Sequence, residues 1–282
     1  AGGAPACRYR ITWPRLGLRR RLALWLKSAL LQDELVKLLN EQNAVIERKY
    51  EEALRQSAEL EQAYLRIMES LMQALDTKDE HTRHHSRMVA AYAVEIAIAD
   101  GLSDADVEQI RRGALLHDIG KIGIPEHILS KPGPLTPHEW TVVRLHPVLG
   151  EKILHPLTFL GSIIQMVAQE HERFDGSGYP RGLSGSQIHR GAHIISVADA
   201  LDAMVSIRPY RQRLTFQEAA AEIQCCAGTQ FDHTVVAAFT QALPRLEAIY
   251  LHHQQDVTSG EPSLSCSPFR VNSAPYSSFP PS

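Results

Sequence analysis

Residues 116–125 read Leu-His-Asp-Ile-Gly-Lys-Ile-Gly-Ile-Pro and place an imidazole beside a carboxylate near the end of an expected helix. That helix is expected to begin after Ser103, where the sequence resembles a capping box. Neighbouring helical residues point about 100° apart, so His117 and Asp118 can both reach one ion lodged against the helix end. An imidazole and a carboxylate suit iron, manganese or zinc, and a carboxylate can also bridge two ions. For an isolated pair, the alternative is a capped helix end with a hydrogen bond between the two side chains.

Other histidines and aspartates lie in surroundings that are equally unusual for polar groups. His85 falls on the apolar face of its helix, and His146 precedes Pro147 at a helix end. Asp199 lies in an apolar run that is expected to be buried, where an unpaired carboxylate would be costly. Convergence on a metal cluster explains these positions together, because bound cations offset the cost of burying charge. The positions that share this character are His85, His117, Asp118, His146, His171 and Asp199.

The composition is that of an ordinary globular protein, with 282 residues, 44% of them hydrophobic and 22% charged. The formal net charge of −3 argues against a chain-wide electrostatic surface for a nucleic-acid polymer. The cysteines lack the spacing of a disulfide framework or a zinc ribbon, so a cytoplasmic location is expected, close to a membrane if another domain precedes the chain. No apolar run approaches the roughly 20 residues that span a bilayer.

The chain divides into four expected segments. Residues 1–30 are basic and form either a solvated lead-in or a membrane-surface contact, whereas the Ser- and Pro-rich residues 257–282 are expected to be a disordered tail. Residues 31–75 carry apolar side chains in steps of three and four, which predicts a helical stalk with a coiled-coil seam. This stalk either packs as a single helix on the next domain or pairs with a second copy, and we favour a parallel homodimer. Residues 76–248 form the principal domain.

The principal domain is expected to be all-α, because alternating strand patterns are scarce in it. Thr136 resembles an N-cap, with Pro137 in the first turn and Glu139 three residues after the cap. Pro147 is expected to stop or kink that helix. The Gly-rich residues 173–185 are the exception and are expected to form a structured loop. Further helical segments are predicted for residues 82–99, 187–204, 216–223 and 234–243.

Three further strings narrow the interpretation: His-Glu-Arg-Phe-Asp-Gly-Ser-Gly-Tyr-Pro at 171–180, Arg-Pro-Tyr-Arg at 208–211 and Gly-Thr-Gln-Phe-Asp at 228–232. Together with the order of the histidines and aspartates, they resemble the HD superfamily of metal-dependent phosphohydrolases and, within it, the HD-GYP family of bacterial cyclic di-GMP phosphodiesterases. The resemblance covers roughly residues 75–245. It implies an HD-domain helical bundle behind the stalk, and a hydrolase that opens cyclic di-GMP to pGpG, with some members continuing to GMP.

The resemblance also implies a centre of two divalent ions, with iron or manganese expected. The family usually has His at the position of Glu170; Glu is still a competent ligand for either metal, although the change can also mark a weakened second site. His81 stands where some members carry a glutamate ligand for a third ion, so two ions are expected. The first ion would be held by His85, His117, Asp118 and Asp199, and the second by Asp118 as a bridge together with His146, Glu170 and His171.

By the same resemblance, the catalytic positions are His117, Asp118 and Lys121, and Lys121 also contacts substrate phosphate. Tyr179 is expected at the pocket, and the Gly178-Tyr179-Pro180 loop either lines that pocket, recognises partner proteins such as GGDEF-domain cyclases, or does both. The remaining substrate positions are Asp79, Arg208 and Arg211; for the two arginines, the alternative is a solvated loop between helices.

Three functions follow from these observations. The favoured one is an active cyclic di-GMP phosphodiesterase in second-messenger signalling. The second is an HD-GYP regulatory module that binds cyclic di-GMP or partner proteins with weak or no turnover, which Glu170 motivates. The third is a phosphodiesterase for another cyclic dinucleotide, such as cyclic GMP-AMP.

Overall fold

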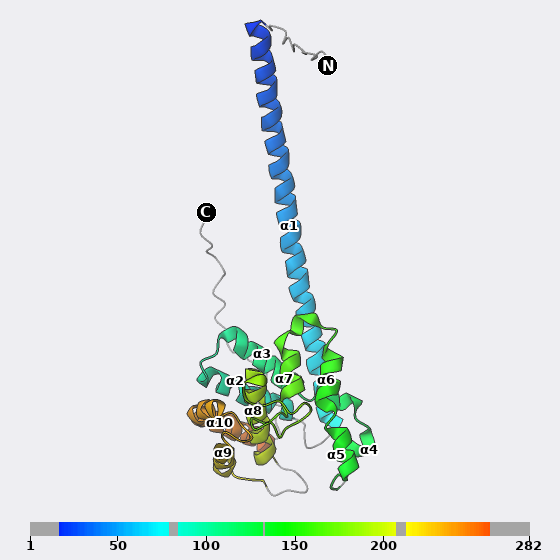
Figure 1. The fold of residues 1–282 in the computed structure, drawn as a ribbon, viewed down its shortest axis with the longest axis vertical. Coiled ribbons are helices and arrows are strands. Elements are labelled where there is room, and N and C mark those ends of the chain that lie inside the picture. Colours follow the sequence, from blue (N-terminus) through cyan, green and yellow to red (C-terminus); the bar gives the residue numbers. More distant parts are fainter. Residues whose placement is uncertain (1–16, 79–83, 132, 207–212, 260–282) are drawn as a thin grey trace, which may run out of the picture. The chain divides into compact units, whose positions relative to one another are not determined.

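The computed structural model describes residues 17–78, 84–131, 133–206 and 213–259 (Figure 1). Over these residues the regular elements are α-helices and short 3-10 segments, with no strand among them, so the all-α prediction is confirmed. In chain order they are α1 (Leu18–Lys78), α2 (His85–Ala99), α3 (Asp104–Leu116), η1 (Ile119–Gly123), α4 (Glu126–Leu129), α5 (Pro137–Val143), α6 (His146–Leu154), η2 (Thr158–Leu160), α7 (Ser162–Gln169), η3 (Gly185–Gln187), α8 (Arg190–Val205), α9 (Phe216–Cys225) and α10 (His233–Ser259).

The long helix expected before the bundle is present as α1, which runs without interruption for 61 residues. It includes residues 18–30, which we expected in a separate basic segment. Residues up to Tyr64 belong to one packing unit, and residues from Leu65 onward belong to another. No helix in the described ranges offers an apolar stretch long enough to cross a bilayer. Apolar side chains of the predicted seam are exposed in the first unit, among them Val36, Leu39, Ile46, Tyr50 and Leu60.

Side-chain caps set where helices of the bundle begin. Ser103 Oγ accepts a hydrogen bond from the backbone N–H of Asp106 at the start of α3. Thr136 and Glu139 form the predicted reciprocal capping box at the start of α5. Pro147 lies in the first turn of α6 instead of ending the preceding helix, because its missing N–H leaves no helical hydrogen bond unmade there.

One predicted helix start differs from the structure. α8 begins at Arg190 and not at residue 187, because the chain first makes the 3-10 turn η3 over residues 185–187. α2 begins at His85, and residue 82, the cap expected for it, lies outside the described residues.

The predicted end of the last helix, near residue 243, was wrong. α10 continues through Pro244 to Ser259 and so includes residues 257–259 of the expected tail; residues 260–282 lie outside the described residues. A helical proline removes one backbone hydrogen bond. Packing nevertheless stabilises the helical turns beyond Pro244, because Leu246 is fully buried and the ring of Tyr250 packs against that of Phe216.

Two hydrophobic clusters organise the bundle. The first lies among α2, α3, α8, α9 and α10 and contains Tyr92, Ile195 and Phe239. The second lies among η1, α6, α7 and the end of α1, and contains Leu116, Ile119 and Met72. Ala114 belongs to the first cluster, whereas Leu116 and Ile119 belong to the second. The His117–Asp118 pair therefore lies where the two clusters meet.

A close backbone approach joins η1 to α6. A Cβ atom on Gly120 would lie 1.9 Å from the carbonyl oxygen of His146 and 2.6 Å from the backbone nitrogen of Gly150. Only glycine fits this contact, and the contact brings the segment after Asp118 directly against the start of α6.

Candidate metal centre

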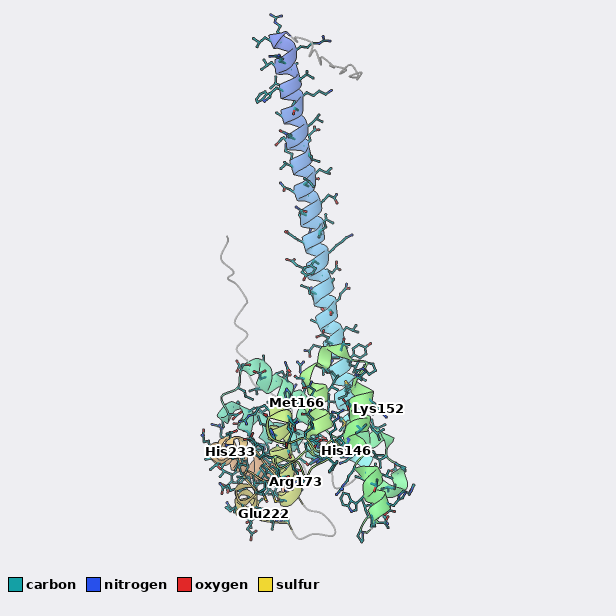
Figure 2. The ribbon with its side chains drawn as sticks, in the orientation of Figure 1. His146, Lys152, Met166, Arg173, Glu222 and His233 are labelled. Atoms are coloured by element: carbon teal, nitrogen blue, oxygen red, sulfur yellow. The ribbon has the colours of Figure 1, made fainter. Side chains whose placement is uncertain are left out.

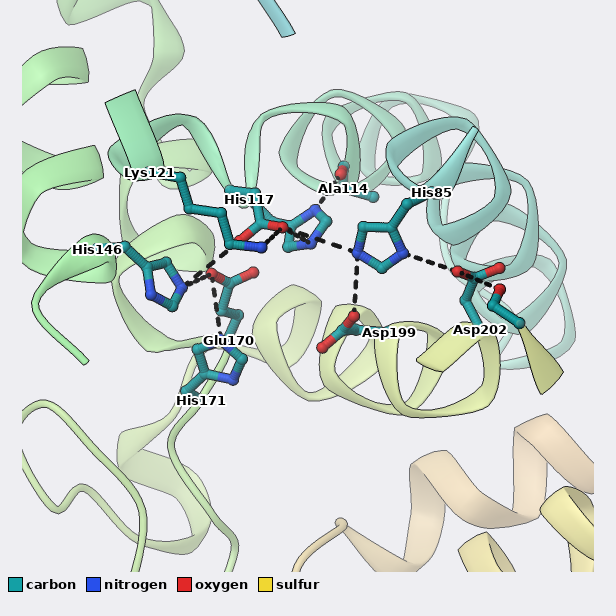
Figure 3. Close-up of polar contacts among 11 residues, drawn as sticks. His85, Ala114, His117, Lys121, His146, Glu170, His171, Asp199 and Asp202 are labelled. Carbon is teal, nitrogen blue, oxygen red and sulfur yellow. Dashed lines mark hydrogen bonds and ion pairs between the residues drawn. The ribbon is translucent and has the colours of Figure 1, made fainter. Parts of the chain in front are cut away.

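Two groups of potential metal ligands lie close together in the bundle (Figure 3). In each group the ligand atoms lie within 4.8 Å of one another. The first group comes from the start of α2, the end of α3 and the middle of α8. The second comes from the start of α6 and the residues that follow α7. The first group is His85, His117 and Asp199, and the second is His146, Glu170 and His171.

Asp118 faces both groups with different carboxylate oxygens. Its Oδ2 lies 3.3 Å from His117 Nε2 and 3.8 Å from His85 Nε2, whereas its Oδ1 lies 3.7 Å from His146 Nε2. The structure thus brings together all the ligand positions expected from the sequence, with one carboxylate placed between the two groups.

Hydrogen bonds at Nδ1 orient three of the imidazoles. His117 Nδ1 donates to the carbonyl oxygen of Ala114 over 2.7 Å, and His146 Nδ1 donates to that of Val143 over 2.8 Å. His85 Nδ1 donates to Asp202 Oδ2 over 2.7 Å. Because each acceptor holds a proton on Nδ1, the Nε2 lone pair of each ring is left for a metal ion.

Unpartnered polar atoms test whether these residues fit a metal. Among the described side chains, His146 Nε2 and both carboxylate oxygens of Glu170 are buried without a hydrogen-bond partner. Glu170 is 1% exposed, and a buried carboxylate in this state is costly. A divalent cation removes that cost, and mixed imidazole and carboxylate donors suit iron, manganese or zinc. The residues present therefore fit a pair of divalent cations.

Ionisation of the acidic groups also favours cation binding. Burial alone would raise the pKa of Asp118, but the Lys121 ammonium and the neighbouring imidazoles hold it well below its ordinary value. Burial would also raise the pKa of Asp199, but the hydrogen bond and charge of His85 hold it below its ordinary value. Burial lowers the pKa of His85, yet hydrogen bonds to Asp199 and Asp202 raise it to about 9. Protons thus balance the carboxylates in the metal-free protein, and cation binding would displace them.

Lys121 lies on η1, one turn after His117, and reaches into the centre. Its Nζ donates to Asp118 Oδ2 over 2.5 Å, and its side chain is 29% exposed. The ammonium group is therefore at the centre while part of the side chain stays open to solvent.

The Gly-rich loop forms a wall of the centre. The Tyr179 ring stacks on the His171 ring, with centroids 4.9 Å apart and planes inclined by 25°. The buried Glu172 carboxylate holds the loop by accepting hydrogen bonds from the backbone N–H groups of Arg181 and Leu183. A Cβ on Gly178 would lie 2.3 Å from the Arg173 nitrogen, so glycine is required at this turn.

A family model described as "HD domain" matches residues 69–235. This chain belongs to the HD-domain family. The family predicted from the sequence motifs is thereby confirmed, and the matched range contains all the metal-ligand positions described above.

Two curated relatives of this HD domain are named as cyclic dinucleotide phosphodiesterases. A "Cyclic di-GMP phosphodiesterase" of Thermotoga maritima is 38% identical over 205 residues, which cover 71% of this chain and 55% of that protein. The "3'3'-cGAMP-specific phosphodiesterase 3" of Vibrio cholerae is 40% identical over 202 residues, covering 71% of this chain and 44% of that protein. The HD-domain chain thus spans about half the length of these relatives.

A solved structure of a cyclic GMP-AMP-specific phosphodiesterase of V. cholerae, V-cGAP3, shares the HD-domain fold. Its TM-score is 0.51 with 18% sequence identity, over 65% of this chain and 50% of that one.

Some site residues of the HD domain were missed in the sequence. Asp202 orients His85, and its signal is its position three residues after Asp199 in the same apolar helix. Glu172 directly follows His171 and holds the loop. The guanidinium of Arg144 lies over the Tyr179 ring, and no sequence pattern pointed to it. The predicted positions Asp79, His81, Arg208 and Arg211 lie outside the described residues.

Proposed function

We propose that this HD domain is a metal-dependent phosphodiesterase that hydrolyses cyclic di-GMP to pGpG, GMP or both in bacterial second-messenger signalling. The observation that carries the proposal is the position of Asp118, whose two oxygens face two separate groups of imidazoles and carboxylates. The named activity of the T. maritima relative supports cyclic di-GMP as the substrate.

The two ligand groups would hold two divalent ions, which we propose to be iron or manganese. His85, His117 and Asp199 would hold one ion and His146, Glu170 and His171 the other, with Asp118 shared. When bound, such a pair of cations supplies Lewis-acid stabilisation of a phosphoryl group and lowers the pKa of water.

The chain's own groups would bind and orient the substrate. Lys121 would neutralise charge on the phosphoryl oxygens, since its ammonium already lies at the centre beside Asp118. Tyr179 would border the substrate pocket, because it stacks directly on His171. We retain Asp79, Arg208 and Arg211 as proposed substrate contacts on sequence grounds alone.

The decisive experiment measures metal content and hydrolysis on the same anaerobically purified sample. We expect two divalent ions per chain and turnover of cyclic di-GMP. Asp118→Ala should lose both, because it removes the carboxylate that faces both groups. Unchanged turnover of Asp118→Ala, with its metal content verified, would refute the mechanism. Tight binding of cyclic di-GMP without hydrolysis, across iron and manganese loading, would instead favour a regulatory module.

A second candidate substrate is cyclic GMP-AMP, because a V. cholerae relative with 40% identity is named as cGAMP-specific. A panel of cyclic di-GMP and 3'3'-cyclic GMP-AMP at equal concentrations separates the two. A higher kcat/KM for cyclic GMP-AMP would reassign the substrate and keep the reaction class.

We also propose a parallel homodimer formed through α1. The exposed apolar side chains in steps of three and four support it, because a helix with such a stripe gains stability by covering it. Light scattering of the protein and of an Ile46→Glu variant tests this: the variant should shift toward monomer, whereas Glu47→Lys, outside the seam, should not. We further propose segment boundaries at residues 30, 75 and 248. We also propose a cytoplasmic location, and GGDEF-domain proteins as partners of the Gly178-Tyr179-Pro180 loop.

A further inference from the structure

Arg144 places a cation beside the candidate metal centre. It ends α5, two residues before His146, and its side chain is exposed. Its guanidinium carbon lies over the Tyr179 ring, 5.3 Å from the ring centroid. Within the described ranges, no carboxylate forms an ion pair with Arg144. The charge of Arg144 is therefore available to an anionic ligand.

The position of this cation is fixed relative to the centre. Tyr179 stacks on His171, and the backbone N–H of Tyr179 donates to the His171 carbonyl oxygen over 3.1 Å. Arg144 thus lies one ring beyond a candidate metal ligand and outside the centre itself. A phosphate bound at the centre would meet Lys121, whereas Arg144 lies at Tyr179, the ring that stacks on His171.

Arg144 forms no side-chain hydrogen bond within the described residues, so its N–H donors are available to a ligand. A guanidinium presents these donors as a planar fork. This planar fork matches two oxygens of a phosphate group.

A cyclic dinucleotide carries two phosphodiesters on opposite sides of its ring, and one enzyme centre can cleave only one at a time. We propose that Arg144 binds the second, uncleaved phosphodiester and thereby selects cyclic dinucleotides over simple phosphodiesters. This inference rests on the proposed function, because it takes a cyclic dinucleotide as the ligand.

The test compares two substrates, cyclic di-GMP and bis(p-nitrophenyl) phosphate, which has a single phosphate. Arg144→Met should raise KM for cyclic di-GMP by about tenfold or more, the usual effect of losing a charged hydrogen bond. Its metal content and its kcat/KM for bis(p-nitrophenyl) phosphate should stay at the wild-type level. Arg144→Lys keeps the charge but loses the planar pair of donors, so its KM for cyclic di-GMP should lie between those of wild type and Arg144→Met. The matched control is Lys152→Met, which removes an exposed cation on α6 (Figure 2) and should behave as wild type.

Three outcomes would overturn the role of Arg144. An unchanged KM for cyclic di-GMP in Arg144→Met would show that no phosphate is bound there. Equal losses on both substrates, or a loss of metal, would show that Arg144 only supports Tyr179. If wild type binds cyclic di-GMP without hydrolysing it, the proposed catalysis fails. Calorimetric Kd values of wild type and Arg144→Met for cyclic di-GMP then replace the KM comparison. Equal Kd values would overturn the role of Arg144 independently of the proposed catalysis.

Discussion

The carboxylate of Asp202 accepts a hydrogen bond from His85 Nδ1 over 2.7 Å, and the opposite nitrogen of that ring points at Asp199 and Asp118. Asp202 is itself 4% exposed, so it holds the ring from inside the first hydrophobic cluster. Partners of this kind fix the tautomer and the orientation of a metal-binding histidine.

Replacing Asp202 should therefore weaken metal binding without removing a ligand. We expect Asp202→Ala to lower the affinity for divalent cations by about 10- to 100-fold, the usual effect of losing such a partner. Asp202→Asn should retain most of the affinity, because its amide oxygen still accepts from Nδ1. Competition with a chromogenic chelator measures both. An affinity in Asp202→Ala equal to that of wild type would show that the bond does not orient His85.

Glu170 should decide whether the second group holds an ion. Its two oxygens are buried and lack hydrogen-bond partners among the described residues, and Oε1 lies 3.4 Å from His146 Nε2. We expect Glu170→Ala to bind one divalent ion per chain in elemental analysis, and Glu170→His to bind two. The exposed Glu222 provides the matched control, since Glu222→Ala should keep two. Two ions in Glu170→Ala would remove Glu170 from the ligand set.

Gly120→Ala should destabilise the bundle, because its new Cβ would lie 1.9 Å from the His146 carbonyl oxygen. Overpacking of this kind typically costs about 1–3 kcal/mol, and a backbone clash falls at or above the upper end. Urea unfolding of the metal-free protein measures the loss. Gly17→Ala is the control, since nothing lies within 4 Å of a Cβ there. Equal midpoints for the two variants would contradict the close approach of η1 and α6.

Chelation should lower the thermal stability of the protein. A ligand that binds only the folded state stabilises it by about 2.7 kcal/mol at a concentration 100 times its Kd. We expect Mn²⁺ to raise Tm of the metal-free wild type, and to raise that of Asp118→Ala much less. A Tm that does not respond to Mn²⁺ in wild type would argue against a preformed centre.

The sequence was most informative where chemistry constrains residue type. The apolar surroundings of His85, His117 and Asp199 predicted that these side chains converge, because buried imidazoles and carboxylates need a common partner, and the structure brings them within ligand distance. Their assignment to one ion came from the family resemblance. The capping box at Thr136 was equally readable, because it depends on residues three positions apart.

Features set by distant packing were not readable. The last helix was predicted to end near residue 243, yet the buried Leu246 beyond Pro244 keeps α10 going, and burial of that kind depends on helices far away in sequence. Arg144 carries no local signal either, because its contact with Tyr179 joins the end of α5 to the Gly-rich loop, which only the folded bundle brings together.

The meeting of the two hydrophobic clusters at His117 and Asp118 has a consequence for how the bundle opens. His85 and Asp199 lie on helices of the first cluster, whereas His146 lies on a helix of the second. A sub-global fluctuation that parts the clusters would separate the ligand groups while leaving each cluster folded. Bound cations would hold the two clusters together across that boundary. Amide hydrogens of α6 and α7 would then exchange with solvent more slowly in the metal-loaded protein than in the metal-free one.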